Sequence, residues 1–150
     1  MNTSSTIRTT TGSNEYHELV SIWRSAVNAT HDFLSAHDRD DIESKLASDY
    51  FPLVELFVAE HQGRPVGFAG VSGNQLEMLF VDANYHNQGI GSALLSYVVE
   101  NCGTEFVDVN EQNDQATQFY KRKGFTVASR SERDDQGRPY PVLHLRRQQF

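Results

Sequence analysis

Apolar and polar residues alternate with two different periods along this chain. Early in the sequence the apolar positions recur every three or four residues, as they do on the buried face of an amphipathic helix. A short strand at 7–10 precedes this helix, and Ser13 or Asn14 can cap it. The apolar face is predicted to consist of Leu19, Ile22, Trp23, Ala26 and Val27.

A second helix is predicted after the polar segment that follows. Either Ser35 or Asp38 can begin it, and the pattern continues to about Tyr50. Pro52 ends it, because proline lacks the N–H group that another helical turn would use. The first third of the chain is therefore expected to form one strand and two helices.

The middle of the chain changes to the pattern of strands. The residues at 56–59 and 66–71 are two β-rich runs, and the polar, glycine-containing turn at 62–64 separates them. Gly73 and Asn74 signal another turn, after which a third apolar run covers 76–81. These three runs predict an antiparallel meander.

Helical spacing returns at Gly89 and ends at Gly103. A short strand at 106–109 and another helix follow, and the chain closes with an antiparallel pair at 125–128 and 142–145. The predicted order is β-α-α-β-β-β-α-β-α-β-β, which is typical of the α/β class. We expect an α+β mixed sheet with flanking helices and one right-handed crossover.

Length and composition fit one domain. The chain has 150 residues with an apolar content of 38%, and we assign the domain to 7–150, behind a flexible polar leader at 1–6. No apolar run is long enough for a signal peptide or a membrane span, and Cys102 is the only cysteine. We expect a cytoplasmic protein with no metal centre and no membrane partner.

The formal net charge of −7 bears on the partners. Nucleic acid is not expected, because its binding relies on Lys and Arg that neutralise phosphates. An acidic balance instead favours cationic substrates.

Two glycines stand where the third strand of the meander gives way to a helix. Gly89 and Gly91 leave backbone N–H groups accessible there, and the first turn of a helix has unpaired donors and a partial positive charge. A pyrophosphate group fits such a helix start, and the Ser92 hydroxyl can add a hydrogen bond. The same glycines also suit a tight turn or close packing of a helix on a sheet.

A dinucleotide-binding fingerprint is the sharper alternative for these glycines. Asp108 lies near the end of the next strand, where a ribose-binding acid would be expected. However, Leu94 occupies the position of the third glycine, and only one β-α-β unit follows. The pattern therefore argues against a dinucleotide site.

Three segments together resemble the GCN5-related N-acetyltransferase (GNAT) superfamily, and they lie at 79–82, 86–91 and 113–125. The resemblance spans 76–125, and the chain is similar to small bacterial members that share a Thr-His-Asp-Phe-Leu segment and a Pro-Tyr-Pro near the C-terminus. It implies a GNAT-like acyl-CoA N-acyltransferase fold with acetyl-CoA as the cosubstrate.

The resemblance also implies which residues hold the cofactor. The strand at 79–81 would present backbone groups to the pantetheine arm, and Asn113 would cap the last helix while contacting the cofactor. His86 stands where the family usually has Arg or Gln, and the phosphate contacts are expected to be mostly main-chain. The implied set is Leu79, Phe80, Val81, His86, Asn87, Gln88, Gly89, Ile90, Gly91, Ser92, Asn113, Ala116 and Phe119.

Acetyl transfer to an amine needs an acid for the departing thiolate and a base for the amine. Tyr120 resembles the general acid of the family, and its alternative role is to complete a helix face. Glu77 is the first candidate base, and the alternative is that it points to solvent. His31 is the second, because the neighbouring Asp32 can orient its imidazole and raise its basicity.

The acceptor site is expected at two segments. His31, Asp32 and Phe33 would border the cleft, with helix capping by this segment as the alternative. Tyr140, which lies between two prolines, would line the same pocket, or else belong to a protected edge strand.

The residues and the resemblance together predict the reaction. We expect transfer of an acetyl group from acetyl-CoA to a primary amine of a small molecule or a protein, by direct attack in a ternary complex. The alternative function is a non-catalytic acyl-CoA binding or sensing domain. The protein is expected to be a monomer or a homodimer.

Overall fold

The computed structural model describes residues 6–148, and the chain separates into two compact units after Thr104. Thr6, which the sequence assigned to the leader, is already the first residue of a strand, and the rest of the predicted leader at 1–5 lies outside the described residues. The predicted single domain at 7–150 stays a prediction.

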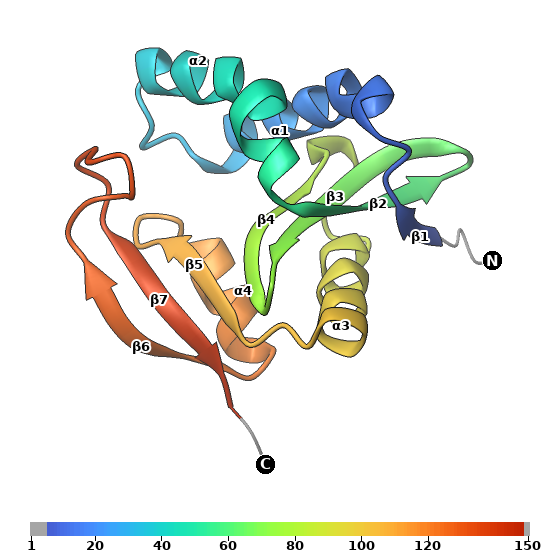
Figure 1. Ribbon diagram of the computed structural model, residues 1–150. Coiled ribbons are helices and arrows are strands. Elements are labelled where there is room, and N and C mark those ends of the chain that lie inside the picture. The colour runs from blue at the N-terminus through green and yellow to red at the C-terminus, as the bar shows by residue number, and fades with distance from the viewer. Residues whose placement is uncertain (1–5, 149–150) are drawn as a thin grey trace. The chain divides into compact units, whose positions relative to one another are not determined.

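The first unit contains an antiparallel sheet of four strands that pair in chain order (Figure 1). They are β1 (Thr6–Thr9), β2 (Glu55–His61), β3 (Arg64–Ser72) and β4 (Gln75–Val81). The predicted first strand and meander are therefore confirmed. Gln62 and Gly63 form the turn between β2 and β3. Both have positive φ, 54° and 77°, which is the backbone conformation that the favoured two-residue hairpin loop requires.

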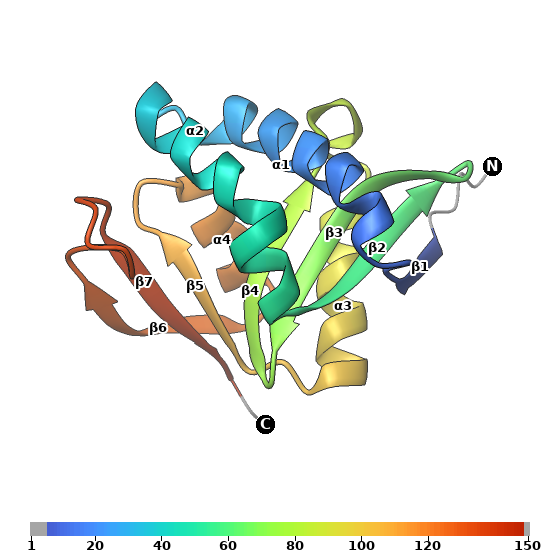
Figure 2. The ribbon, with the colours of Figure 1, turned by 45° about the horizontal axis from the view of Figure 1, so that its top comes forward.

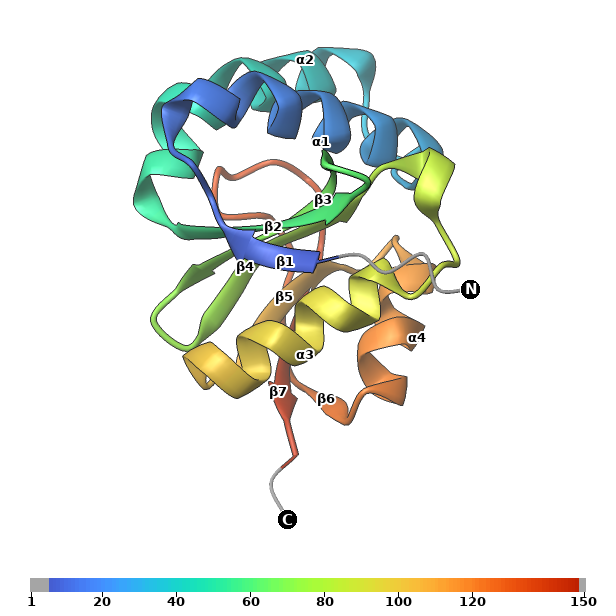
Figure 3. The ribbon, with the colours of Figure 1, turned by 90° about the vertical axis from the view of Figure 1, so that its right-hand side faces the viewer.

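Helices cover both faces of this sheet. Helices α1 (Tyr16–Thr30) and α2 (Ala36–Lys45) lie on one face, and α3 (Ile90–Cys102) lies on the other (Figure 3). Figure 2 shows α1 and α2 side by side over the strands. All five apolar residues predicted for the face of the first helix are buried in α1.

The start of α1 differs from the prediction. A 3-10 turn at Ser13–Glu15 precedes it, and neither Ser13 nor Asn14 caps the helix. The polar group that organises this end is the buried Glu15, which accepts hydrogen bonds from Arg8, Thr10 and the Thr11 N–H. Burial alone would raise the pKa of Glu15, but these donors together lower it to about 2.

The second helix begins as predicted and ends earlier. Ser35 is its cap, because its Oγ accepts from the Asp38 N–H at 3.0 Å. The regular α-helix stops at Lys45, and a π-helical turn at Leu46–Tyr50 carries the chain to the predicted end. Pro52 then lies in a 3-10 turn before β2 begins.

The described part of the second unit, 105–148, contains three strands and one helix. Strand β7 (Val142–Arg147) lies between β5 (Phe106–Asn110) and β6 (Phe125–Ser131), and it is antiparallel to both. Helix α4 (Asp114–Arg122) contacts β5 and β6. The strands and helices follow one another in the predicted order throughout, which agrees with the predicted α/β class. Between residues 6 and 148, no helix combines the length and apolar character needed to cross a bilayer.

Candidate functional site

The start of α3 leaves backbone donors uncapped. Gly89 precedes the helix with φ 82°, and no side chain caps this end. The first helical hydrogen bond runs from the Ala93 N–H to the Gly89 carbonyl at 3.0 Å, so the N–H groups of Ile90, Gly91 and Ser92 precede the regular bonding pattern. Gly89 is exposed, and these donors belong to a helix start that solvent reaches.

Charge distinguishes this helix start from those of the other described α-helices. Helices α1, α2 and α4 carry Glu18, Asp38 and Asp114 in their first turns, where a carboxylate offsets the positive end of the helix dipole. The first turn of α3 has no acidic residue. Its positive end is therefore uncompensated and suits an anionic group.

Close packing fixes the position of α3 against the sheet. Gly67 lies on β3, and a Cβ atom there would come within 3.2 Å of Ile90 Cγ2 and 3.3 Å of Leu94 Cδ1. Any larger residue would push Ile90 and Leu94 away by a few tenths of an ångström, so glycine favours this close approach of α3 to the strand. Sequence reasoning did not assign Gly67 a role, although a glycine inside a strand is a signal of such an approach.

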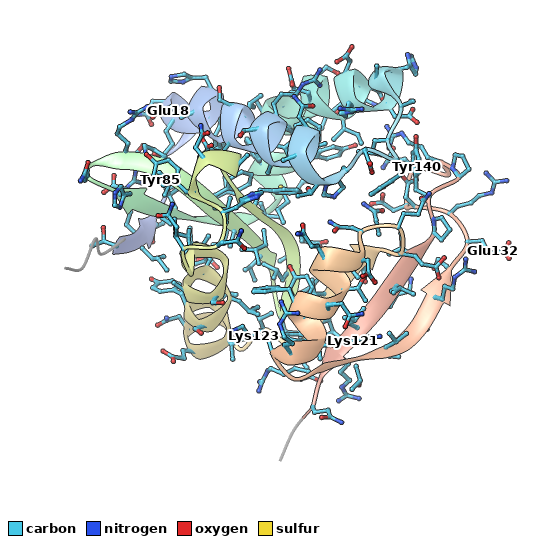
Figure 4. The ribbon with its side chains drawn as sticks, turned by 180° about the vertical axis from the view of Figure 1, so that it is seen from behind. Glu18, Tyr85, Lys121, Lys123, Glu132 and Tyr140 are labelled. Carbon is cyan, nitrogen blue, oxygen red and sulfur yellow. The ribbon has the colours of Figure 1, made fainter. Side chains whose placement is uncertain are left out.

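The turn that leads into α3 is anchored to α1. Ser25 Oγ donates to Asp82 Oδ1 at 3.2 Å and accepts from the Ala83 N–H at 3.0 Å, while Asp82 Oδ1 also accepts from the Asn84 N–H at 2.9 Å. Figure 4 shows Tyr85 on the same turn. Ser25 was missed from the sequence, because nothing local marks a helix serine as a tether for a distant turn.

The His86 side chain folds back onto its own turn and bonds to the end of β4. Its Nε2 lies 2.8 Å from the Val81 carbonyl, and a carbonyl only accepts, so Nε2 carries the proton. The His86 side chain is thus bonded to the end of β4. Beyond it, Asn87 adopts φ 63°, and both Asn87 and Gln88 are exposed.

Strand β4 carries the predicted pantetheine segment and an irregularity. Leu79, Phe80 and Val81 are half-buried. Gly70 pairs with Met78 and Val71 pairs with Leu76, so Glu77 is the extra residue of a β-bulge, and it is exposed. Alternation therefore does not decide where Glu77 points.

His31 lies next to this strand, at the end of α1. Its ring centroid is 6.3 Å from that of Phe80 and 5.2 Å from that of Phe33. Thr30 Oγ1 donates to the Ala26 carbonyl at 2.8 Å and lies 2.7 Å from His31 Nδ1. A hydroxyl has one proton, so Thr30 accepts from Nδ1–H and the lone pair of the neutral ring lies on Nε2.

His31 differs from the prediction in both its orientation and its basicity. Thr30, not Asp32, bonds to Nδ1, and Asp32 is exposed. Burial lowers the pKa of His31 to about 4, Arg39 acts in the same direction, and the opposing effect of Asp32 is the smallest of the three. His31 is therefore uncharged at neutral pH and a weaker base than the sequence suggested.

The remaining cofactor and acid candidates lie in the second unit. Asn113 is buried and caps α4, because its Oδ1 accepts from the Ala116 N–H at 3.1 Å. Tyr120 is buried, with its ring 5.1 Å from that of Phe119 and 5.7 Å from that of Phe125. Burial raises the pKa of Tyr120, and its hydroxyl makes no hydrogen bond within 6–148.

Tyr140 lies in the loop before β7, where Figure 4 labels it, and its side chain is buried. Its N–H donates to the Arg138 carbonyl at 2.8 Å, and the carbonyl of the following Pro141 accepts from the Glu111 N–H at 2.9 Å. The alternative that placed Tyr140 in an edge strand is wrong, because β7 begins at Val142.

The candidates thus fall into two groups. The first unit brings together the start of α3, the end of β4 and the His31 segment, whereas Asn113, Ala116, Phe119, Tyr120 and Tyr140 belong to the second unit. Asp108, which a dinucleotide site would need for the ribose, is bonded instead to His144 Nδ1 at 2.7 Å.

Comparison with known proteins gives consistent matches. The family model of the acetyltransferase (GNAT) domain matches residues 24–140. The chain is 46% identical over 132 residues to the peptidyl-lysine N-acetyltransferase YjaB of Salmonella typhimurium, which covers 87% of this chain and 90% of that protein. It is 44% identical to YjaB of Escherichia coli over 132 residues, with 87% and 89% covered.

Solved structures show the same fold. The solution structure of the apo form of Escherichia coli YjaB covers 95% of this chain and 97% of its own, with 42% identity and a TM-score of 0.86. An N-acetyltransferase of Thermoplasma acidophilum in complex with coenzyme A covers 94% and 98%, with a TM-score of 0.71. Its identity of 18% supports the likeness in fold alone.

Proposed function

The chain belongs to the GCN5-related N-acetyltransferase superfamily and is an acetyltransferase, and we propose that it transfers the acetyl group of acetyl-CoA to the ε-amine of a protein lysine. The start of α3 is the observation that supports acetyl-CoA as the cosubstrate, because its uncapped N–H groups and its first turn without an acid suit a pyrophosphate. The likeness to two peptidyl-lysine N-acetyltransferases supports the acceptor. A net charge of −7 also suits a cationic protein surface.

The proposed reaction is a direct transfer in a ternary complex. The neutral amine nitrogen forms a bond to the thioester carbonyl carbon, the carbon–sulfur bond breaks, and the thiolate leaves with a proton from the enzyme. The amine gives up a proton to a base. The products are an N-acetyl-lysine and the free thiol, so atoms and charge balance without a further reactant.

Tyr120 is the proposed acid. A phenol with a raised pKa stays protonated at neutral pH, and a hydroxyl without a hydrogen bond to the described residues keeps its proton for a ligand. The rings of Phe119 and Phe125 hold the phenol in place. The donor therefore costs little reorganisation as charge develops on sulfur.

His31 and Glu77 are proposed to serve the acceptor in different ways. Amines have pKa values near 10 and must lose a proton before attack. An imidazole with a pKa of about 4 accepts a hydrogen bond but takes up a proton poorly, so we assign His31 to binding the amine. Glu77, an exposed carboxylate at the bulge of β4, is assigned as the base, directly or through water.

The central experiment offers one lysine at a time. A peptide with a blocked N-terminus and a single lysine is incubated with acetyl-CoA, and both thiol release and the site of acetylation by mass spectrometry are followed. The matched control replaces the lysine by arginine, which keeps the positive charge but offers no ε-amine. We expect thiol release and acetylation with the first peptide only.

Two results would contradict the proposal in different ways. Equal thiol release with both peptides would remove the lysine acceptor and leave an enzyme for another amine. Binding of acetyl-CoA without turnover on peptides, free amines or protein substrates would instead favour the sensing domain.

A further inference from the structure

A polar face of the sheet in the second unit carries three side chains that the transfer reaction does not use. Val107 and Leu145 pair across β5 and β7 and are buried. Their neighbours Asp108 and His144 form the next pair, and they therefore point to the opposite face. There the side chains are 44% and 35% exposed, so solvent and small molecules reach them.

A bulge in β6 adds Ser131 to this face. Val127 pairs with Leu145 and Ser129 pairs with His144, so Ala128 is the extra residue. Without that insertion, alternation would place Ala128 opposite His144 and turn both serines to the other face. Bulges often re-aim a side chain in this way.

The three side chains form a continuous hydrogen-bonded chain across three strands. Asp108 Oδ1 lies 2.7 Å from His144 Nδ1, and His144 Nε2 lies 2.7 Å from Ser131 Oγ. A nucleophile within hydrogen-bond reach of a base that a third group orients is the arrangement that activates a serine.

The hydrogen-bonding roles follow from the chemistry of the groups. A carboxylate only accepts, so His144 Nδ1 carries a proton and donates to Asp108. In the neutral ring the lone pair then lies on Nε2, where it accepts from the Ser131 hydroxyl. This is the tautomer that a general base for Ser131 requires.

We propose that Ser131, His144 and Asp108 form a second reactive site, at which Ser131 accepts acyl groups from small activated esters and releases them to water. Ser131 Oγ forms a bond to the acyl carbon, and its proton passes to His144 Nε2. The ester oxygen leaves as an alcohol after taking that proton. Water then cleaves the acyl-serine by the same route, which regenerates the hydroxyl and releases a carboxylic acid. Asp108 is a positioning residue, because it acts through His144.

The exposed setting defines which substrates this site takes. The side chains of Asp108 and His144 are partly exposed, and the proposal assigns no protein donor to the oxyanion that forms during attack. The main gain therefore comes from general base catalysis, about 10²-fold at the lower end of its usual range. Small esters with good leaving groups are therefore the substrates, rather than unactivated amides. The site lies wholly in the second unit and needs neither Tyr120 nor the start of α3.

The test uses the full chain and two probes. A fluorophosphonate, which modifies activated serines by displacement of fluoride, is followed by peptide mapping, and p-nitrophenyl acetate reports turnover. We expect the adduct on Ser131 and not on Ser129. Ser129 lies on the same strand as Ser131 and pairs with His144 of β7, but His144 Nε2 is bonded to Ser131. Ser131→Ala should abolish labelling and lower ester hydrolysis about 10²-fold, whereas Ser129→Ala should change neither.

The roles of the other two residues are tested by rate. His144→Gln and Asp108→Asn should slow labelling of Ser131 at least about tenfold while leaving acetyl transfer to the lysine peptide unchanged. Labelling of the wild-type protein at other serines but not Ser131 would overturn the proposal without any variant. An adduct on Ser131 that forms equally fast in folded His144→Gln would reduce the arrangement to a surface hydrogen-bonded chain.

Discussion

Helices α2 and α3 begin in the same unit and in opposite ways. At the start of α2, Ser35 Oγ accepts from the Asp38 N–H at 3.0 Å, and the Asp38 carboxylate itself lies in the first turn. At the start of α3, Gly89 supplies no side chain, and no acid follows. Helix α2 thus caps one of its own donors and offsets its dipole, whereas α3 does neither with its own side chains.

This contrast between α2 and α3 indicates which helix start binds a ligand. A cap contributes about 1 kcal/mol to stability, so a helix that forgoes it gives up that stabilisation. Gly89 adds further backbone freedom that folding must restrict. Such a start is explained if a ligand supplies the missing acceptor, and acetyl-CoA has a pyrophosphate to do so.

The largest effect on acetyl-CoA binding is expected when side chains cover the backbone donors at the start of α3. Gly89→Val with Gly91→Val should abolish measurable acetyl-CoA binding in calorimetry, because valine at φ 82° is strained and side chains would cover the donors. The control is Gly103→Val at the other end of α3, where φ is also positive at 64° and a Cβ atom meets open space.

The control variant separates strain from binding. Both substitutions should lower the melting temperature, and only the pair at the start should remove binding. If the Gly103 variant loses affinity to the same extent, the glycines of α3 matter for folding and the comparison with α2 has no functional content.

Tyr120→Phe tests whether binding and chemistry are separate. Burial raises the pKa of Tyr120 and keeps its hydroxyl protonated, so we expect Tyr120 to serve the reaction as an acid instead of holding the pyrophosphate. Turnover should fall by about 10² to 10⁴-fold with little change in acetyl-CoA affinity. The measurement is single-turnover transfer at saturating acceptor, so that product release does not mask the chemical step. Unchanged turnover would return Tyr120 to a packing role.

The sequence predicts where a helix begins or ends when the residues that determine it are neighbours in the chain. The limits of α3 were predicted correctly because Gly89 and Gly103 mark them in the chain itself. The start of α1 was not, because Glu15 is held by Arg8 from a strand rather than by a neighbouring cap. An Asn or Ser signal alone cannot reveal a partner on another element.

The two bulges could not be predicted from the sequence, because each depends on the pairing with another strand. Glu77 and Ala128 are each the extra residue against a partner strand, and only the register of that partner reveals them. His31 shows a subtler limit. Its neighbour Asp32 suggested a basic imidazole, but burial outweighs a nearby charge and lowers the pKa to about 4.

That burial predicts a pH dependence at the C-terminal end of α1. The folded pKa of about 4 lies below the ordinary 6.5, so the unfolded chain binds the proton more strongly, and stability is lost as pH falls from 6.5 to 4. The loss attributable to His31 is about 3 kcal/mol. Denaturant unfolding of wild type and His31→Gln at intervals across this window measures it.

Glu15 provides the internal reference for this experiment. Its pKa of about 2 lies below the ordinary 4.5, so its contribution is lost between pH 4.5 and 2 in both proteins. The two curves should therefore converge in slope below pH 4. Parallel curves between pH 6.5 and 4 would mean that His31 is not buried in the neutral form.

The smallest effect comes from making α3 resemble α2 in charge alone. Ser92→Asp places a carboxylate in the first turn of α3, which should stabilise the helix by about 0.3–1 kcal/mol. The same charge repels a pyrophosphate, so acetyl-CoA affinity should fall about fivefold, at a cost of about 1 kcal/mol for charges 4 Å apart in water. Ser92→Asn has the same shape without the charge. Equal affinity of the two variants would argue against an anion at this turn.

The most direct measurement follows the amide N–H signals of the two helix starts by NMR while ligand is added. With acetyl-CoA, the signals of Ile90, Gly91 and Ser92 should move, while those of Asp38 and Arg39 at the start of α2 should not. S-acetyl-pantetheine, which has the thioester and lacks the pyrophosphate, should leave all five in place. Saturation with acetyl-CoA that leaves residues 90–92 unmoved, or equal movement with both ligands, would contradict the assignment of the α3 start to the pyrophosphate.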